Sequence, residues 1–179
     1  MAPGLESLAG PNEEFLQYLE GDSVESAIKA LQDLERLVDE EGPFDGVMAF
    51  SQAAAMAATF ILRSQRKDPE KHGPRPVFRC AVFFCGGVPV DPSDLQDHGT
   101  IRPLNVEKDG EVIHIPTAHI WGHDDQLYPT FGPVLSKLCC GEQRADFIHQ
   151  GGHEIPGAKS PSSVVQAARA IKRAIEMSN

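Results

Sequence analysis

The amino-acid sequence predicts an α/β fold in which helices cover both faces of a parallel sheet. Short apolar runs typical of buried strands alternate with amphipathic helical stretches, an order that favours a parallel sheet. One of these runs passes through a serine directly into a helical stretch, in the order strand, sharp turn, helix. The chain has 179 residues and is 41% hydrophobic, enough for one sizeable core, so we expect a single domain over residues 1–179.

The first helix is expected to begin near Ser23. Residues 1–22 carry glycine, proline and acidic residues without strand periodicity, which predicts an irregular lead-in with at most a turn of helix around residues 14–18. Asp22 or Ser23 can cap the helix, and Gly42 followed by Pro43 ends it. Its apolar side chains recur every three or four residues: Val24, Ala27, Ile28, Leu31, Leu34 and Val38.

The remaining elements follow from apolar runs and helical periodicity. Residues 46–50 form an apolar run that predicts a strand, followed by a helix over 52–66. Three more strands and a C-terminal helix are expected at 77–85, 117–121, 145–149 and 164–175. The stretch between Gly86 and Pro116 lacks periodicity, so we interpret it as a long loop of the kind that often forms a lid or binding loop.

Charge and composition narrow the class of partner. Sixteen basic and 26 acidic residues give a net charge of −10, which disfavours nucleic acid and anionic membranes and favours a neutral or acyl substrate. No signal peptide or apolar run of membrane-spanning length is visible, so we expect a cytoplasmic protein. No cofactor is expected. The four cysteines lack metal-type spacing and are interpreted as free thiols: Cys80, Cys85, Cys139 and Cys140.

The candidate nucleophile is Ser51. In an open parallel sheet, ligands bind beyond the carboxyl ends of the strands, and Ser51 lies in the turn between a strand and a helix. There its hydroxyl would stand exposed, and the backbone N–H of Gln52 would point toward a developing oxyanion. The alternative is that Ser51 only caps the following helix, a role that serine often fills.

The other strand ends supply the partners that a serine nucleophile needs. Serine is a poor nucleophile without a base and an orienting carboxylate. The segment WGHDD offers Asp124 or Asp125, and the segment GGH offers His153, in the chain order serine, aspartate, histidine. His123 and His149 also fall near strand ends, but the two glycines before His153 give a turn that can direct its ring toward the serine.

The sequence also contains residues capable of two other kinds of chemistry. Cys85 ends a strand and could act as a thiol nucleophile, but nothing in the sequence lowers its pKa, so a place in the pocket wall is favoured. His119, His123, Asp124 and Asp125 cluster within seven positions without the spacing of a typical metal site, so we expect no metal ligands.

The segment EEGPFDGVMAFSQAAAMAA closely resembles GPFDGVLGFSQGAALAA of the fungal "family of serine hydrolases" branch of the α/β-hydrolases. VFRCAVFFCGG, PTAHIWGHDDQLYP and IHQGGHEIP resemble further landmarks of that family, so the resemblance runs from about residue 17 to the C-terminus. It implies Ser51 as nucleophile, Asp125 as orienting carboxylate and His153 as base. It also implies an esterase or thioesterase acting on a small-molecule acyl ester or a carrier-protein thioester, in some members a polyketide.

The chain departs from the family pattern in two ways. Ala49 and Ala53 replace the glycines of the nucleophile turn, where added methyl groups can crowd the crossing. The opening strand and the His-Gly loop that supplies another oxyanion donor have no counterpart in residues 1–22. We therefore expect a sheet lacking the usual first strands, impaired hydrolysis, and an exposed edge able to pair with a second copy.

These departures leave two alternatives to an esterase. One is a repurposed hydrolase fold that binds or cyclises a polyketide-like ligand without hydrolysis. The other is a non-catalytic interaction protein that pairs through its sheet edge.

Overall fold

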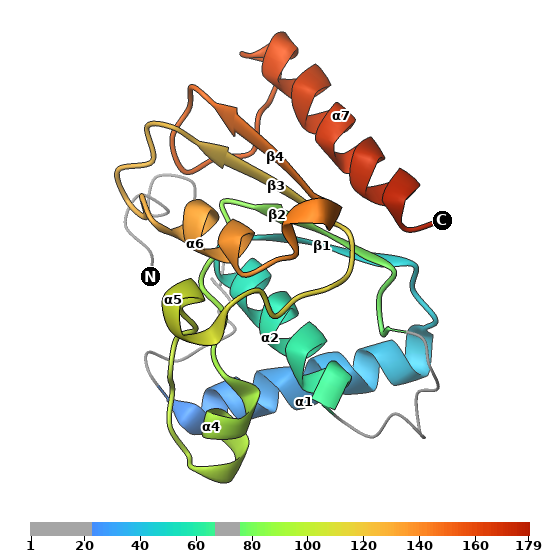
Figure 1. Ribbon diagram of the computed structural model, residues 1–179, viewed down its shortest axis with the longest axis vertical. Helices are drawn as coiled ribbons and strands as arrows, with labels where there is room; N and C mark the ends of the chain where they lie inside the picture. The colour runs from blue at the N-terminus through green and yellow to red at the C-terminus, as the bar shows by residue number, and fades with distance from the viewer. Residues whose placement is uncertain (1–22, 67–75) are drawn as a thin grey trace, which may run out of the picture.

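A parallel sheet of four strands in the order β1-β2-β3-β4 forms the centre of the protein. The computed structural model describes residues 23–66 and 76–179, so the predicted lead-in at 1–22 lies outside the described residues. The strands are β1 (Gly46–Phe50), β2 (Cys80–Phe84), β3 (Thr117–Gly122) and β4 (Arg144–His149). The predicted parallel sheet is confirmed, and all four strands point their carboxyl ends to one edge (Figure 1).

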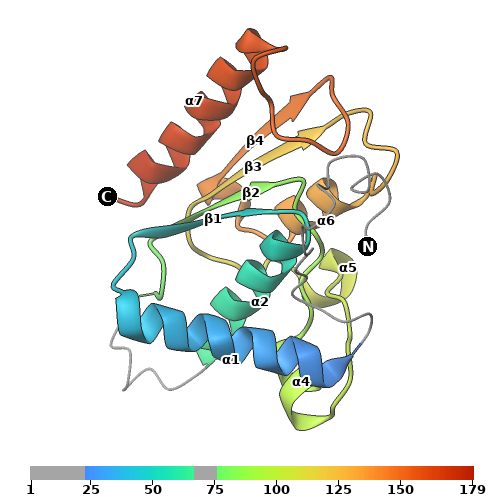
Figure 2. The ribbon, with the colours of Figure 1, turned by 180° about the vertical axis from the view of Figure 1, so that it is seen from behind.

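Helices lie on both faces of this sheet, as predicted. α7 packs across β2, β3 and β4 on one face, and α1, α2 and α6 lie on the other (Figures 1 and 2). The helices of the described residues are α1 (Val24–Glu41), α2 (Gln52–Arg66), α4 (Pro92–Asp97), α5 (Val106–Asp109), α6 (Phe131–Lys137), the 3-10 turn η1 (Gly141–Gln143) and α7 (Pro161–Met177).

The predicted boundaries of the first helix are confirmed by its caps. The Ser23 hydroxyl accepts a hydrogen bond from the backbone N–H of Ser26 at 3.2 Å, which satisfies a donor that the helix leaves unpaired. At the other end, the N–H of Gly42 donates to the carbonyl of Val38.

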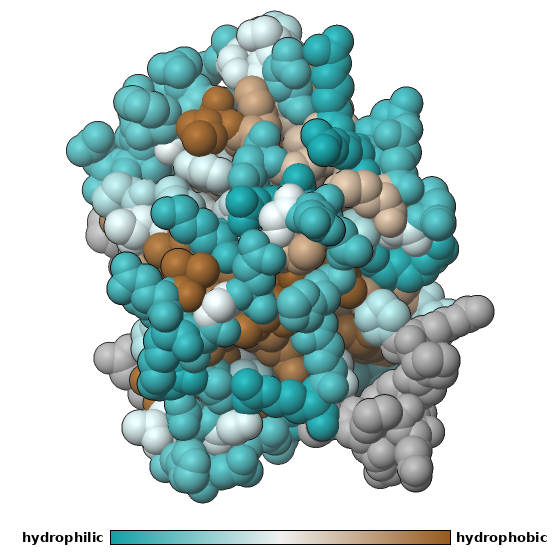
Figure 3. Space-filling model, viewed as in Figure 1, coloured by the Kyte–Doolittle hydropathy of each residue, from teal (hydrophilic) through white to brown (hydrophobic). Residues whose placement is uncertain are grey.

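The apolar side chains form two cores, one on each side of the sheet. Along β2, alternate residues point to opposite faces, so Phe83 belongs to the core under α2 and Phe84 to the core under α7. The face seen in Figure 3 is mostly hydrophilic, with a few separate hydrophobic patches. No helix among the described residues is long and apolar enough to cross a membrane.

The stretch predicted as a long loop is partly helical. It contains α4 and α5, and Arg102 binds the carboxylates of Asp91, Asp94 and Asp109. α4 and α5 span only 6 and 4 residues, too short to show helical periodicity in sequence. The predicted strand at 77–85 is also shorter, because the ladder begins at Cys80 and ends at Phe84.

β1 is the outermost strand on its side of the described sheet. Its Met48 side chain is 63% exposed, because α7 covers the neighbouring strands and leaves β1 open. A groove of about 720 Å³ runs between β1, α1 and α2 and is lined partly by Met48.

Candidate active site

Ser51 occupies a sharp turn between β1 and α2. Its backbone has φ 53°, a left-handed conformation that is uncommon for a residue with a side chain. Its N–H donates to the carbonyl of Phe84 at 2.9 Å, and its own carbonyl accepts from the N–H groups of Ala54 and Gly87. The carbonyl thus ties the turn both to the start of α2 and to the segment after β2, while the hydroxyl faces His153. This geometry resembles the strained strand-to-helix turn that exposes a nucleophile.

The two alanines that replace glycines in this turn fit without left-handed backbone. Among the described non-glycine residues, only Ser51 and Cys85 have positive φ. Ala49 is buried within β1, and Ala53 packs against the core under α2. The methyl groups of Ala49 and Ala53 therefore do not disrupt the turn at Ser51.

The His153 ring links the serine to a carboxylate. Its Nε2 lies 2.8 Å from the Ser51 hydroxyl oxygen, and its Nδ1 lies 2.7 Å from Oδ2 of Asp125. The tautomer that satisfies both contacts carries its proton on Nδ1, which donates to the carboxylate, while Nε2 accepts from the hydroxyl. The structure therefore brings together the three side chains singled out in the sequence, in the arrangement of a Ser-His-Asp triad.

The two neighbouring aspartates have different environments. Asp125 is 5% exposed, and its Oδ1 accepts hydrogen bonds from the N–H groups of Leu127 and Tyr128. Burial by itself would raise the pKa of Asp125, but the hydrogen bonds from Tyr128 and His153 outweigh it and lower that pKa. Asp124 is exposed and binds the equally exposed His123.

The turn that carries His153 is fixed by backbone contacts to the end of β3. The N–H of Asp124 donates to the carbonyl of Gly151, and the N–H of His123 donates to the carbonyl of His149. The ring of His149 accepts from the N–H of Gly151 at 3.0 Å, so this histidine supports the turn rather than facing the serine.

Two aromatic side chains flank the His153 ring, a contact that no pattern in the sequence indicates. The rings of Phe50 and Tyr128 lie 5.0 and 4.9 Å from it, and Tyr128 stacks on Phe131. Leu127, adjacent to Tyr128 in sequence, and Ile155, two residues after His153, are 54% and 50% exposed. The rings of Phe50 and Tyr128 thus give the candidate site an apolar wall beside His153.

The remaining candidates lie as follows. Gln52 is the first residue of α2, so its backbone follows the serine at the helix start. Burial raises the pKa of the Cys85 thiol to about 11, which disfavours a thiolate nucleophile. His119 is buried in β3 beside Thr117, and burial lowers its pKa to about 3, whereas His123 is exposed, so these two do not form the metal cluster considered from the sequence.

The chain is similar in sequence to a known family of hydrolases and to individual esterases. Residues 9–165 match the model of a family described as "Serine hydrolase (FSH1)". The chain is 38% identical to Esterase FPY3 of Fusarium mangiferae, over 97% of this chain and 76% of that protein. It is 34% identical to Esterase OVCA2 of Homo sapiens, over 75% of this chain and 51% of that one. A solved Bacillus cereus carboxylesterase aligns with TM-score 0.49 and 13% identity, over 87% of this chain and 68% of that one.

Proposed function

Because the chain belongs to the FSH1 serine hydrolase family, we propose that it cleaves an ester or thioester through an acyl-enzyme formed on Ser51. The observation that carries the proposal is the continuous pair of hydrogen bonds from Ser51 through His153 to Asp125, at 2.8 and 2.7 Å. A serine hydroxyl held against an oriented imidazole is the arrangement that activates serine as a nucleophile.

In the proposed reaction, the Ser51 hydroxyl oxygen attacks the substrate carbonyl while His153 Nε2 accepts the hydroxyl proton. Asp125 orients the ring and stabilises the imidazolium that forms. The N–H of Gln52 at the start of α2 stabilises the oxyanion. The carbonyl carbon then releases the alcohol or thiol, which takes the proton from His153, and water activated by the same histidine hydrolyses the acyl-enzyme.

We propose a neutral acyl group of small or medium size as the part of the substrate that the site binds. The aromatic rings of Phe50 and Tyr128 beside His153 offer an apolar surface for it. The net charge of −10 makes an anionic polymer a poor partner. A polyketide acyl chain, presented as an ester or as a carrier-protein thioester, falls within this class.

The test is covalent labelling with a fluorophosphonate, followed by intact-mass measurement. The wild-type chain is expected to gain one adduct that the Ser51→Ala variant lacks. Ser64→Ala is the matched control, because Ser64 lies in the last turn of α2 and donates its hydroxyl to the carbonyl of Phe60. Failure of the folded wild-type chain to label would reject the acyl-enzyme and favour a repurposed binding role.

A further inference from the structure

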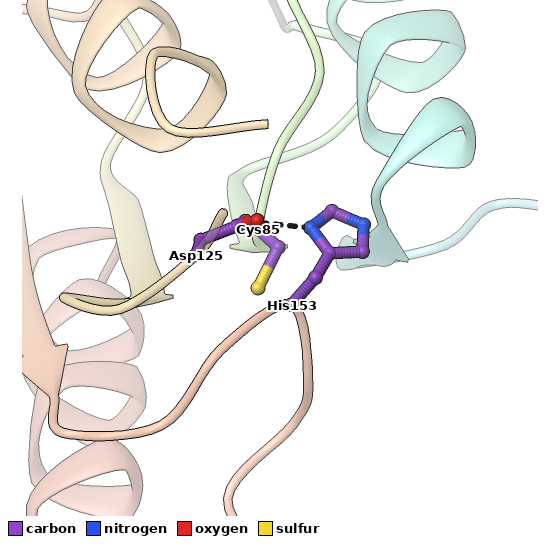
Figure 4. Close-up of side chains that lie close together, drawn as sticks. All are labelled: Cys85, Asp125 and His153. Atoms are coloured by element: carbon purple, nitrogen blue, oxygen red, sulfur yellow. Dashed lines mark hydrogen bonds and ion pairs between the residues drawn. The ribbon is translucent and has the colours of Figure 1, made fainter. Parts of the chain in front are cut away.

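Three potential metal ligands converge beside the candidate nucleophile. The Cys85 sulfur, a carboxylate oxygen of Asp125 and a ring nitrogen of His153 all lie within 4.8 Å of one another (Figure 4). They follow the carboxyl ends of β2, β3 and β4, three adjacent strands of the sheet. Among residues 23–66 and 76–179, no other group of three such side chains comes together in this way.

We propose that these three side chains form an inhibitory site for a thiophilic divalent cation such as Zn²⁺ or Cd²⁺. The inhibitory part rests on the proposed hydrolase function. Thiolate, imidazole and carboxylate are all zinc ligands, and catalytic zinc sites combine three protein ligands with one open position. With bond lengths of about 2.0–2.3 Å around a tetrahedral ion, ligand atoms lie roughly 3.3–3.8 Å apart. The sulfur, within 4.8 Å of the other two ligand atoms, needs at most a modest approach, whereas His153 Nδ1 and Asp125 Oδ2, 2.7 Å apart, must separate to admit the ion.

The backbone helps to hold the sulfur in place. Cys85 has φ 44°, and its N–H donates to the carbonyl of Ile120 at 2.8 Å. Its thiol lies 3.5 Å from the carbonyl oxygen of Glu154, next to the histidine in sequence. The sulfur is thus fixed on the side of the site where the turn carrying His153 meets the end of β2.

Metal binding at this position would disable the base. Nδ1 is the ring nitrogen that faces Asp125, while Nε2 faces the serine hydroxyl. A cation bound to Nδ1 takes the place of the proton there, and the neutral ring must then carry its proton on Nε2. In that state Nε2 donates to Ser51 and cannot accept its proton.

Binding of the cation displaces one proton from Cys85 and relocates one on His153. The Cys85 thiol forms a sulfur–metal bond and releases its proton to solvent. The Nδ1 proton of His153 transfers through solvent to Nε2, and no oxidant or reductant takes part. Removal of the cation by a chelator reverses both changes.

Cd²⁺ and Zn²⁺ serve as the probes. Ultraviolet absorbance from a sulfur–cadmium bond reports binding without any need for activity, and Zn²⁺ inhibition of ester hydrolysis reports the consequence. Cys85→Ser removes the sulfur, with Cys85→Ala as a second replacement. Cys140→Ser is the matched control, because Cys140 is a free, partly exposed cysteine outside the cluster.

We expect the cadmium absorbance in wild type, Cys140→Ser and the inactive Ser51→Ala, and its loss in both Cys85 variants. The Zn²⁺ concentration for half-inhibition should rise at least about tenfold in the Cys85 variants. Absorbance that survives loss of Cys85, or is absent from wild type, would overturn the site. Absorbance without inhibition of an active wild type would overturn the inhibitory role. If the wild type has no esterase activity but both it and Ser51→Ala show the absorbance, the proposed hydrolase function is rejected and the metal site is retained.

Discussion

Gly122 and Gly151 approach so closely that a side chain at Gly122 has no room. A Cβ at this position would lie 2.1 Å from the carbonyl oxygen of Gly151 and 2.2 Å from that of Gly152. Both are backbone atoms, so a rotamer change cannot relieve the overlap. The end of β3 is therefore shaped to receive the turn that carries His153.

Gly122→Ala is expected to displace that turn and to lower esterase turnover by about 100-fold, because a shift of about 1 Å in a catalytic group can cost that much. The matched control is Gly152→Ala, whose Cβ would meet only the carbonyl oxygen of Asp124, at 3.7 Å. Steady-state hydrolysis of a chromogenic ester, with circular dichroism to verify folding, makes the comparison. Equal turnover in the two variants would show that the close approach does not position His153.

Asp125→Asn is expected to reduce turnover by about 10²–10⁴-fold, because an amide no longer favours the ring tautomer with its proton on Nδ1. The neighbouring Asp124→Asn serves as control. The side chain of Asp124 is exposed and binds the exposed ring of His123, so its replacement should change turnover less than about threefold. The reverse ranking would assign the orienting role to Asp124.

The part of the site that sequence predicts best is the part encoded by contiguous residues. The run at 46–50 leads through Ser51 into α2 without an intervening loop, so strand, turn and helix could be placed together. The Gly-Gly pair before His153 likewise predicted a turn. These features are local, and local signals survive in a single sequence.

Features that depend on tertiary contacts could not be predicted in this way. Asp124 and Asp125 are neighbours in sequence, and the hydrogen bond with His153, the backbone N–H bonds to Asp125 and the difference in burial separate them. The aromatic rings of Phe50 and Tyr128 come from segments far apart in the chain and meet only around His153. α6 was missed because seven residues show less than two full turns of periodicity.

Asp91 should make the stability of the protein depend on acid pH. Arg66 and Arg102 bind its carboxylate at 2.9 and 2.8 Å, and the N–H groups of Ser93 and Asp94 cap onto it at the start of α4. Burial alone would raise the pKa of Asp91, but the hydrogen bond from Arg66 and the backbone bonds lower it to about 2. The folded state thus favours the ionised form.

Because the folded pKa lies below the ordinary aspartate value of 3.8, this contribution is complete above about pH 4 and is lost as the pH falls toward 2. Asp91→Asn is expected to lower the free energy of unfolding at pH 7 by about 1.5–3 kcal/mol, with the difference from wild type shrinking between pH 4 and 2. Urea titrations across this range measure it. The control is Asp97→Asn, on the exposed end of α4, which should have little effect on the free energy of unfolding at any pH. If Asp91→Asn lowered the free energy of unfolding equally at every pH, ionisation of Asp91 would not be the cause.

Self-association through the edge strand β1 stays a prediction, and a substitution on that strand can test it. β1 is outermost in the described sheet, and its Met48 is 63% exposed beside the groove along α1. An unpaired strand edge can add another strand, and a lysine there opposes such pairing. Light scattering of the wild type is expected to give a concentration-dependent mass above the monomer mass of 19.4 kDa, and Met48→Lys should return it to that value. Ile148→Lys is the control, because Ile148 is 50% exposed on β4 at the opposite edge. Dissociation by Ile148→Lys but not by Met48→Lys would place the contact at β4. A wild type that is monomeric at every concentration would exclude pairing through either edge.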